Sequence, residues 1–466
     1  MVSVPTWAFL LLCALAAWAA LERLLLPSVR WVLRRRVNRV IDELNEHLAL
    51  RIEPFRLTKR QVLIDRLMFD PDVQAAAEAH ATEARMRRDE AMDEVRQYAR
   101  EIVPSFNAYA YFRFGYWIAR TLARALYRVR VGTARDARLR ELAEDTSVVF
   151  VMNHRSNMDY VLVCYLAATR SALSFAVGEW AKVWPLHALL RSTGAYFIRR
   201  GSRNDLYRRV LASYVRMATR GGVTQAVYPE GGLSQDGKLQ PARLGLLSYM
   251  VGAFADDERI DKPDIVFVPV GINYDRVLED RTLLEMRNRG RRSPPRVAGL
   301  LGGLRFIGKQ LLLAITGRWY RFGYAAVGFG EPVSLKEYTQ LEAINWQDTE
   351  RRRDDIQTLG DHLLSAVGDV VPVLPVALVA TVVQQVSAPM DRLELKARVA
   401  TLVEELEAKG VYVHVPRNDR DYAIGVGLRM LKLRKILKVD NGLVAVNEDE
   451  LALLDYYAQS IAHHIR

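Results

Sequence analysis

Cysteine is scarce in this chain, which has only Cys13 and Cys164 among its 466 residues. Two cysteines cannot build a disulfide framework or a cysteine-based zinc site. Glycine and proline, with 28 and 17 residues, show no low-complexity bias. The sequence therefore excludes a disulfide-stapled secreted scaffold and permits a reducing compartment.

Signatures of nucleic-acid binding are also missing, because no helix-turn-helix, zinc-finger or RNA-recognition pattern occurs. The chain nevertheless carries 66 Lys and Arg residues against 54 Asp and Glu residues, a formal net charge of +12. Such an excess favours an anionic partner, which can be a membrane surface, a phosphorylated substrate or nucleic acid. Since the basic residues are dispersed, we expect no nucleic-acid partner.

Size and composition indicate a folded protein with more than one domain. Half of the residues are apolar and 26% are charged, as in globular proteins. Single cores stop growing beyond about 250–300 residues. Changes in composition predict four regions: a membrane anchor with a basic flank over 1–40, a helical region over 41–135, an α/β domain over 136–345 and a mainly helical region over 346–466.

A long apolar run stands at the N-terminus. The segment Val2–Leu21 has 20 residues and no charge, which is about the length that spans a bilayer. Five arginines follow it, namely Arg30, Arg34, Arg35, Arg36 and Arg39. The positive-inside rule then predicts a single span in the inner or cytoplasmic membrane, with the rest of the chain in the cytoplasm. The alternative is an amphipathic helix lying in the membrane interface.

A second segment suited to membranes is Ala108–Gly132, which is rich in aromatic residues and arginine. Such residues favour the headgroup region of a bilayer. The alternative is an ordinary helix packed on the main domain.

Short β-branched runs alternate with helical stretches after residue 145, which predicts an α/β fold with a mostly parallel sheet flanked by helices. The predicted strands are Ser147–Met152, Leu173–Val177, Ala195–Ile198, Gly222–Tyr228, Ile265–Val270 and Gly323–Phe329. The predicted helices are Asp159–Ala168, Asn204–Arg220, Leu244–Phe254 and Leu300–Thr316. The hydrophilic stretches Asp256–Asp264 and Leu278–Arg296 are expected to be loops, and Val370–Val383, with its two prolines, a buried core segment.

The strongest chemical feature follows the first strand of this pattern, in the segment Asn153–Tyr160. His154 and Asp159 are five residues apart and would diverge by about 140° on a regular helix. They can meet only if His154 lies in the turn after the strand and Asp159 in the first helical turn. Asp159 would then orient the imidazole and stabilise its protonated form. No serine nucleophile accompanies the pair, so the nucleophile should be a substrate hydroxyl. The spacing alone also fits a structural histidine.

Three further blocks follow in order: Gly194–Gly201, which contains Phe-Ile-Arg-Arg, Tyr228–Gly232, which contains Pro-Glu-Gly-Gly, and Val268–Gly271. With these four blocks the chain resembles the glycerol-3-phosphate and dihydroxyacetone-phosphate acyltransferase family, whose members carry a His-x4-Asp motif. The segments Tyr274–Glu279 and Tyr456–His464 are similar to that branch too.

The resemblance implies a role for each block. His154 and Asp159 would be catalytic, and Pro269 would shape the sheet near the site. The guanidinium groups of Arg199 and Arg200 would clamp a phosphate. The residues it implies for substrate binding are Arg155, Ser156, Arg199, Arg200, Glu230, Gly231, Gly232, Lys238 and Arg243.

One departure from the family concerns the stretch after Gly232, where arginines usually follow. This chain has Leu233 and Gln235 there. Either Lys238 or Arg243 would supply the missing positive charge, or the acceptor differs from glycerol 3-phosphate.

The resemblance implies transfer of a fatty acyl group to the sn-1 hydroxyl of glycerol 3-phosphate, giving lysophosphatidate at a phospholipid membrane. Acyl-CoA or acyl-carrier protein would be the co-substrate, with no metal and no other cofactor. The apolar stretch Trp180–Leu190 is a candidate acyl groove, or else core. Lysophosphatidate and dihydroxyacetone phosphate are alternative acceptors, and a non-enzymatic phospholipid-binding membrane protein is the alternative of another class.

Overall fold

The protein is described here by a computed structural model. It describes residues 53–132, 146–167, 172–178, 186–199, 201–257, 259, 262–288, 322–386 and 388–465. The predicted N-terminal membrane segment and the helix predicted over Leu300–Thr316 lie outside these residues. Within these ranges, no helix combines the length and the apolar character that a bilayer crossing requires.

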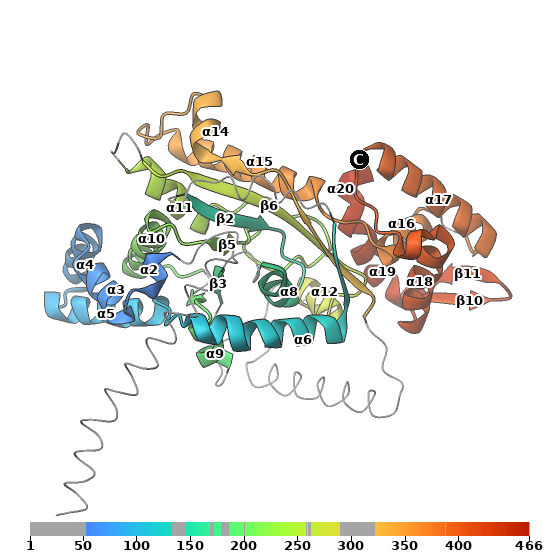
Figure 1. The fold of residues 1–466 in the computed structure, drawn as a ribbon, viewed down its shortest axis with the longest axis horizontal. Helices are drawn as coiled ribbons and strands as arrows, with labels where there is room; N and C mark the ends of the chain where they lie inside the picture. Colours follow the sequence, from blue (N-terminus) through green and yellow to red (C-terminus); the bar gives the residue numbers. More distant parts are fainter. Residues whose placement is uncertain are drawn as a thin grey trace, which may run out of the picture.

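An eight-stranded mixed sheet forms the centre of the molecule (Figure 1), in the order β1-β7-β6-β2-β5-β3-β4, with β8 beside β6. The strands are β1 Arg128–Val131, β2 Ser147–Met152, β3 Ser174–Val177, β4 Tyr196–Phe197, β5 Gln225–Val227, β6 Ile265–Tyr274, β7 Tyr324–Phe329 and β8 Val333–Ser334. Five of the pairings are parallel, and β6 runs antiparallel to β7 and β8. The predicted α/β fold with a mostly parallel sheet is confirmed.

Both faces of the sheet are buried, as the alternation along β2 shows. Val148, Phe150 and Met152 belong to one core cluster, while Val149 and Val151 belong to another. The first cluster includes residues of α6 (Tyr116–Leu126), α8 (Met158–Ala167) and the C-terminal region. The second includes residues of α10 (Asp205–Arg220), α11 (Gly245–Ala255) and α15 (Arg352–Asp369). Successive residues of a strand face opposite sides of the sheet. Because both sides are buried here, these strands are almost continuously apolar.

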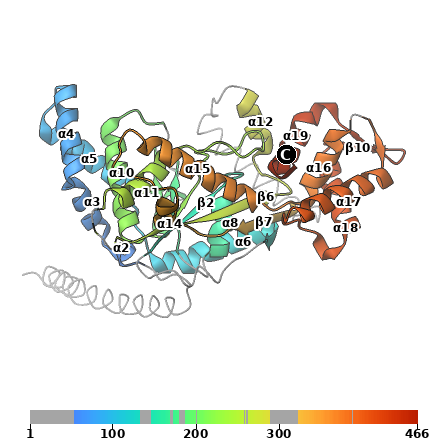
Figure 2. The ribbon, with the colours of Figure 1, turned by 90° about the horizontal axis from the view of Figure 1, so that it is seen from above.

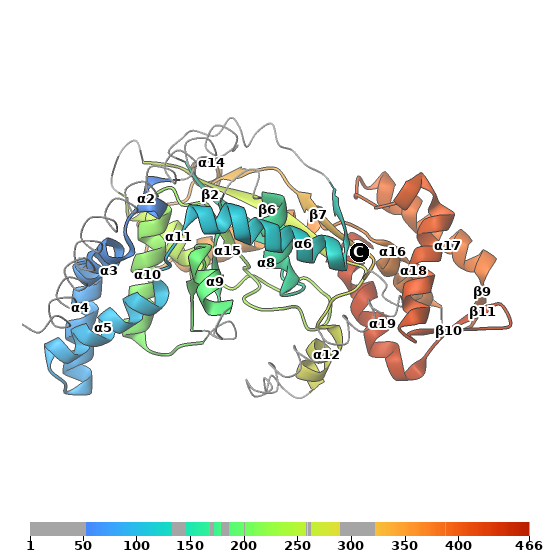
Figure 3. The same ribbon diagram turned by 60° about the horizontal axis from the view of Figure 1, so that its bottom comes forward.

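The N-terminal helices are α2 Pro54–Leu57, α3 Arg60–Met68, α4 Pro71–Ala84 and α5 Arg88–Ile102. They contribute residues to the core cluster that contains α10, and they lie at one end of the molecule (Figure 2). A π-helical turn, η1 Ala110–Gly115, leads into α6, which runs across the sheet beside α8 (Figure 3). Shorter helices are α9 Leu186–Ser192, α12 Asp280–Asn288 and α14 Leu335–Leu341.

The C-terminal region packs at the opposite end. Its main helices are α16 Pro375–Gln385, α17 Arg392–Ala408, α18 Arg420–Leu433 and α19 Leu451–Ala458, followed by η5 Gln459–Ile461 and α20 Ala462–Ile465. A small antiparallel sheet joins them, with β9 Met390–Asp391, β10 Leu437–Asp440 and β11 Leu443–Val446. Short 3-10 turns are η3 Pro416–Asn418 and η4 Glu448–Glu450. Burial of nearly all of α16 confirms that Val370–Val383 is core.

One sequence prediction of the fold is wrong. Leu278–Arg296 was expected to be a loop, but its first half contains α12 (Asp280–Asn288). This helix is amphipathic over fewer than three turns: Leu283 and Leu284 are buried, and Asp280 pairs with Arg434. Two apolar residues in a basic stretch are too weak a periodic signal to predict a helix.

Candidate active site

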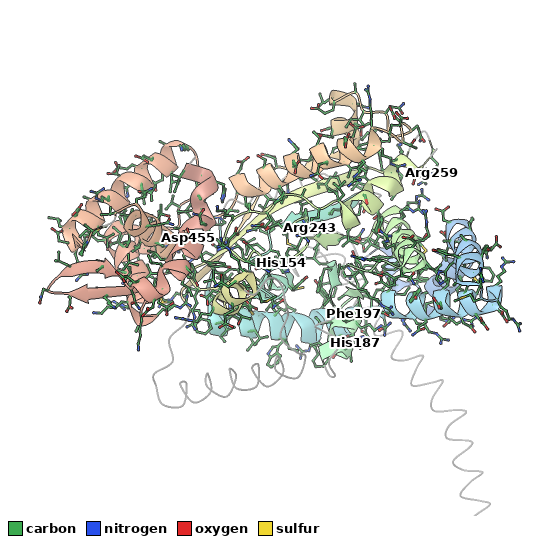
Figure 4. All side chains as sticks on the ribbon, turned by 180° about the vertical axis from the view of Figure 1, so that it is seen from behind. His154, His187, Phe197, Arg243, Arg259 and Asp455 are labelled. Atoms are coloured by element: carbon green, nitrogen blue, oxygen red, sulfur yellow. The ribbon has the colours of Figure 1, made fainter. Side chains whose placement is uncertain are left out.

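The site lies where β2 and β5 end. The two strands are parallel and paired, with Val151 opposite Val227, so the residues after them emerge at the same edge of the sheet. This carboxyl edge is where α/β sheets place ligands. His154 follows β2 and Glu230 follows β5, and the backbone N–H of His154 donates to Glu230 Oε1 at 2.9 Å. Figure 4 shows His154 near the middle of the molecule.

His154 and Asp159 are in direct contact. His154 lies in the turn after β2 and Asp159 is the second residue of α8. The imidazole Nδ1 lies 2.9 Å from Asp159 Oδ2, and both residues are buried, at 1% and 0% exposure. The turn is held because the backbone N–H groups of Arg155 and Ser156 donate to the same oxygen at 2.7 and 3.0 Å. The carboxylate therefore fixes both the ring and the turn that carries it.

Two tyrosines complete the surroundings of the pair. The hydroxyl of Tyr274, at the end of β6, donates to Asp159 Oδ1 at 2.7 Å. Tyr228 stacks on the imidazole of His154 with ring centroids 4.0 Å apart and planes at 26°. Burial raises the pKa of both phenols above its usual value, and nearby Asp159 raises it further. Tyr274 therefore stays a hydrogen-bond donor at neutral pH.

The hydrogen-bond contacts of Glu230 differ from those that the resemblance implied. The resemblance implied that it lines the acceptor pocket, but its Oε1 accepts from His154 N and its Oε2 accepts from Gln240 N at 3.2 Å. Burial raises its pKa to about 8. The two oxygens of Glu230 thus tie the turn that carries His154 to the loop after β5.

The loop after β5 also carries the glycines and the cations that were predicted to bind substrate. Gly231 has φ +70, and a Cβ there would come within 2.7 Å of Arg243 Cδ, so Arg243 lies against the loop. Arg243 is exposed and lines an open cavity of about 590 Å³ together with Arg352 and Arg353. Gly232 is half-buried and Lys238 is exposed.

Arg199 follows β4 and its guanidinium is engaged within the protein. It forms a bidentate ion pair with Glu101 of α5, with Nη2–Oε2 at 2.6 Å and Nε–Oε1 at 3.1 Å. It also lies over the rings of Tyr98 and Tyr207. A phosphate would have to compete with Glu101 for this fork. Arg200 and most of the predicted acyl groove at Trp180–Leu190 lie outside the described residues.

Ser156 and Pro269 make structural contacts. The Ser156 hydroxyl donates to Glu279 Oε2 at 2.7 Å and accepts from Met158 N at 3.1 Å, so it starts α8. Pro269 lies within β6 opposite Val151, where the neighbour of β6 on its other side changes from β8 to β7. A residue without a backbone N–H fits at this gap in the pairing.

Arg155 is buried beside the C-terminal region. Its Nη1 donates to the carbonyl of Gly237, and its guanidinium lies 4.9 Å from the ring centre of Tyr456 in α19. Tyr228, Tyr274 and Tyr456 were not predicted as site residues. All three stand in motif segments that the sequence singled out, but side-chain contacts across elements cannot be read from those segments.

Among the residues described, no group of three or more His, Cys, Asp and Glu side chains is placed to hold a metal ion. A buried His–Asp pair at the carboxyl edge of a mostly parallel sheet, without its own nucleophile, is suited to acyl transfer between bound substrates. The family model described as Acyltransferase matches residues 134–273, the segment that contains this pair.

A second family model, the glycerol-3-phosphate acyltransferase C-terminal region, matches residues 309–465. Together with the relatives below, these matches show that most of the chain is similar to glycerol-3-phosphate acyltransferases. The predicted resemblance is confirmed.

Curated relatives match along most of this chain. The glycerol-3-phosphate acyltransferase of Pseudomonas aeruginosa (strain LESB58) is 29% identical over 92% of this chain and 51% of its own length. That of Aeromonas hydrophila is 26% identical over 88% of this chain and 50% of its own. The chain thus spans about half the length of the curated relatives it matches. Among solved structures, the 1-acyl-sn-glycerophosphate (LPA) acyltransferase from Thermotoga maritima is 17% identical, over 66% of this chain and 95% of that one, with a TM-score of 0.31.

Proposed function

We propose that the protein transfers a fatty acyl group from an acyl thioester to the sn-1 hydroxyl of glycerol 3-phosphate, giving lysophosphatidate and a free thiol. The observation that carries the proposal is the 2.9 Å contact between His154 and Asp159 at the sheet edge. The names of the relatives support the choice of acceptor.

The proposed reaction uses His154 as a general base. Asp159 accepts from Nδ1–H, so Nε2 takes the proton of the acceptor hydroxyl. The hydroxyl oxygen attacks the thioester carbonyl, the carbon–sulfur bond breaks, and the leaving thiolate receives the proton from the imidazolium. Asp159 stabilises the imidazolium between these transfers, and Tyr274 in turn stabilises the carboxylate. No cofactor beyond acyl-CoA or acyl-carrier protein is needed.

Arg199 and Arg200 remain the predicted phosphate ligands. Glu101 occupies the Nε–Nη2 edge of Arg199, so a phosphate would either bind through Nη1 or displace Glu101. Lys238 and Arg243, the predicted replacements for the missing arginines, are exposed at the loop after β5.

The proposed setting is a membrane, with the catalytic part on the cytoplasmic side. The apolar run and the arginines of the first forty residues support it. A second support lies on η1 and α6, where Tyr109, Phe114 and Trp117 are 45%, 54% and 63% exposed. Exposed aromatic side chains close in sequence to the exposed Arg113 and Arg120 are typical of a surface that rests on lipid headgroups. Because α6 packs on α8, such contact would hold the site near the bilayer.

A membrane-fraction assay tests the function. The full chain is offered glycerol 3-phosphate, dihydroxyacetone phosphate or lysophosphatidate, each with acyl-CoA and with acyl-carrier-protein thioester. We expect esterification of glycerol 3-phosphate that depends on His154. Preference for another acceptor would reassign the substrate, and the absence of turnover with every pair would favour a phospholipid-binding protein without catalysis.

A further inference from the structure

Arg155 is a buried cation with unused donors. The residue is 3% exposed, and Nη1 donates to the carbonyl of Gly237. Within the described chain, its Nε and Nη2 atoms have no hydrogen-bond partner, and no carboxylate forms an ion pair with it. A buried, unpaired charge costs several kcal/mol. Among the described residues, two N–H donors of this guanidinium are therefore available to a ligand.

The side chain next to it also has a free donor. The Tyr456 ring lies against the Arg155 guanidinium, the residue is fully buried, and its hydroxyl has no partner among the described residues. Tyr456 belongs to α19, while Arg155 belongs to the catalytic turn. The loop after β5 lies between them, because Gly237 contacts both Arg155 and the backbone carbonyl of Tyr456.

Carboxyl groups interact electrostatically with both donors: Glu230 with Arg155, and Asp280, Glu279 and Asp159 with the hydroxyl of Tyr456. Burial raises the pKa of Glu230 to about 8, so the carboxyl that interacts with Arg155 is mostly neutral at pH 7. Both of its oxygens already accept backbone N–H groups. A guanidinium edge with two free N–H groups matches two oxygens of a phosphate, and a phenol can donate to the third. A carboxylate has only two oxygens, so it would pair with the guanidinium and leave the phenol without a partner.

We propose that Arg155 and Tyr456 form a phosphate-binding site beside His154, so that the C-terminal region supplies a residue that holds the acceptor. The site rests on the proposed function in one respect: the phosphate is that of glycerol 3-phosphate. Arg155 is adjacent to His154 in the chain. One turn therefore carries both the anchor for the phosphate and the base for the hydroxyl.

Tyr456→Phe is the sharpest test, because it removes a hydroxyl that has no hydrogen-bond partner among the described residues. We expect an unchanged melting temperature, a KM for glycerol 3-phosphate raised about tenfold, and unchanged KM for the acyl donor. The matched control is Tyr196→Phe, another fully buried tyrosine whose hydroxyl has no partner among the described residues, in the other core cluster. It should leave all three quantities unchanged.

Arg155→Lys provides the second variant, because it keeps the charge and loses the planar fork. We expect the KM for glycerol 3-phosphate to rise at least tenfold, more than in Tyr456→Phe. If both variants keep the wild-type KM while the wild-type enzyme acylates glycerol 3-phosphate, the phosphate site is wrong and the function stands.

Direct binding separates the two hypotheses further. Calorimetry on full-length His154→Ala protein compares glycerol 3-phosphate, glycerol, inorganic phosphate and coenzyme A, each with and without Tyr456→Phe. We expect binding of glycerol 3-phosphate and phosphate that Tyr456→Phe weakens, and no binding of glycerol. Binding of coenzyme A alone would assign the site to the donor and overturn the proposal. Phosphate binding with the same affinity in Tyr456→Phe as in the parent protein would overturn it too.

Discussion

Tyr274 donates a 2.7 Å hydrogen bond to Asp159 Oδ1, the carboxylate oxygen that does not contact His154. The phenol comes from the end of β6 and is fully buried. The His–Asp pair therefore has a third member, contributed by the strand next to β2. Among the described residues, the carboxylate of Asp159 therefore bonds to two elements: the turn after β2 and the strand β6.

Tyr274→Phe should lower kcat about tenfold, since Asp159 loses the donor that stabilises its charge and orientation. Steady-state kinetics check this, with Tyr127→Phe as the matched control. Tyr127 packs on Tyr274 with ring centroids 5.2 Å apart and donates to the carbonyl of Arg276. Its loss should reduce stability by about 1 kcal/mol and leave kcat unchanged. Equal kcat values in the two variants would show that Tyr274 has only a packing role.

His154→Ala should abolish measurable acyl transfer, and Asp159→Asn should lower kcat by about 10³-fold or more. An asparagine cannot accept from His154, Arg155 and Ser156 while also accepting from Tyr274, because its nitrogen only donates. Circular dichroism and melting temperature separate loss of fold from loss of chemistry. A folded His154→Ala protein with the wild-type rate would falsify the assignment of the base.

The contact between His154 and Asp159 was predictable because it is local. A few residues are enough to predict the end of a strand, a turn and the start of a helix. Only one arrangement of these elements brings the imidazole and the carboxyl together. The main strands and α10 were predictable for a similar reason, since buried parallel strands and long amphipathic helices repeat their pattern. The strands β1 and β8 were not, because they lack the apolar run of the buried strands: β1 reads Arg-Val-Arg-Val and is mostly exposed at the edge of the sheet, and β8 is half-buried.

The rest of the site depends on packing between distant segments. Glu230 was expected to face the substrate, but the folded chain places the backbone of His154 and Gln240 against its two oxygens. Arg199 was expected to offer a free fork, but Glu101, in a helix 98 residues earlier, occupies it. Tyr456 reaches Arg155 only because the C-terminal helices pack on the loop after β5. Neither hydrophobic periodicity nor the spacing of motifs predicts contacts between such distant segments.

Gly237→Ala should destabilise the protein and remove activity together. Gly237 has φ +86, and a Cβ there would overlap the backbone carbonyl of Tyr456. The strained backbone and the displaced helix should cost about 2–4 kcal/mol. Gly410→Ala is the control, because Gly410 has φ +77 with no atom near the added Cβ, so it should cost about 1–2 kcal/mol and keep kcat. Melting temperature and kcat are measured for both, and similar values in the two variants would mean that the loop and α19 do not depend on each other.

Glu230 should make stability depend on pH in a defined window. Burial raises its pKa from 4.5 to about 8 in the folded state, so the folded protein holds a proton that the unfolded chain releases. Its contribution is fully present below pH 4.5 and is lost as the pH rises to about 8, by at most about 1.4 kcal/mol per pH unit. Melting temperatures of wild type and Glu230→Gln between pH 5 and 9 are compared. The wild type should lose stability relative to the variant as pH rises, and a constant difference would contradict a raised pKa.

Trp117→Ser should weaken membrane attachment through α6. Trp117 is 63% exposed beside Phe114 and Arg113, so its transfer to a headgroup region removes a large ring from water. The control is Phe69→Ser, which removes an aromatic side chain that is 76% exposed on the N-terminal helices. Flotation with vesicles containing anionic lipid measures the bound fraction of each full-length variant, at low and at high salt. We expect a several-fold lower affinity for Trp117→Ser, wild-type affinity for Phe69→Ser and weaker binding at high salt for all, because Arg113 and Arg120 add an electrostatic attraction that ions screen. Equal affinities of the two variants would assign attachment to another part of the chain and leave the exposed face of α6 without a role at the bilayer.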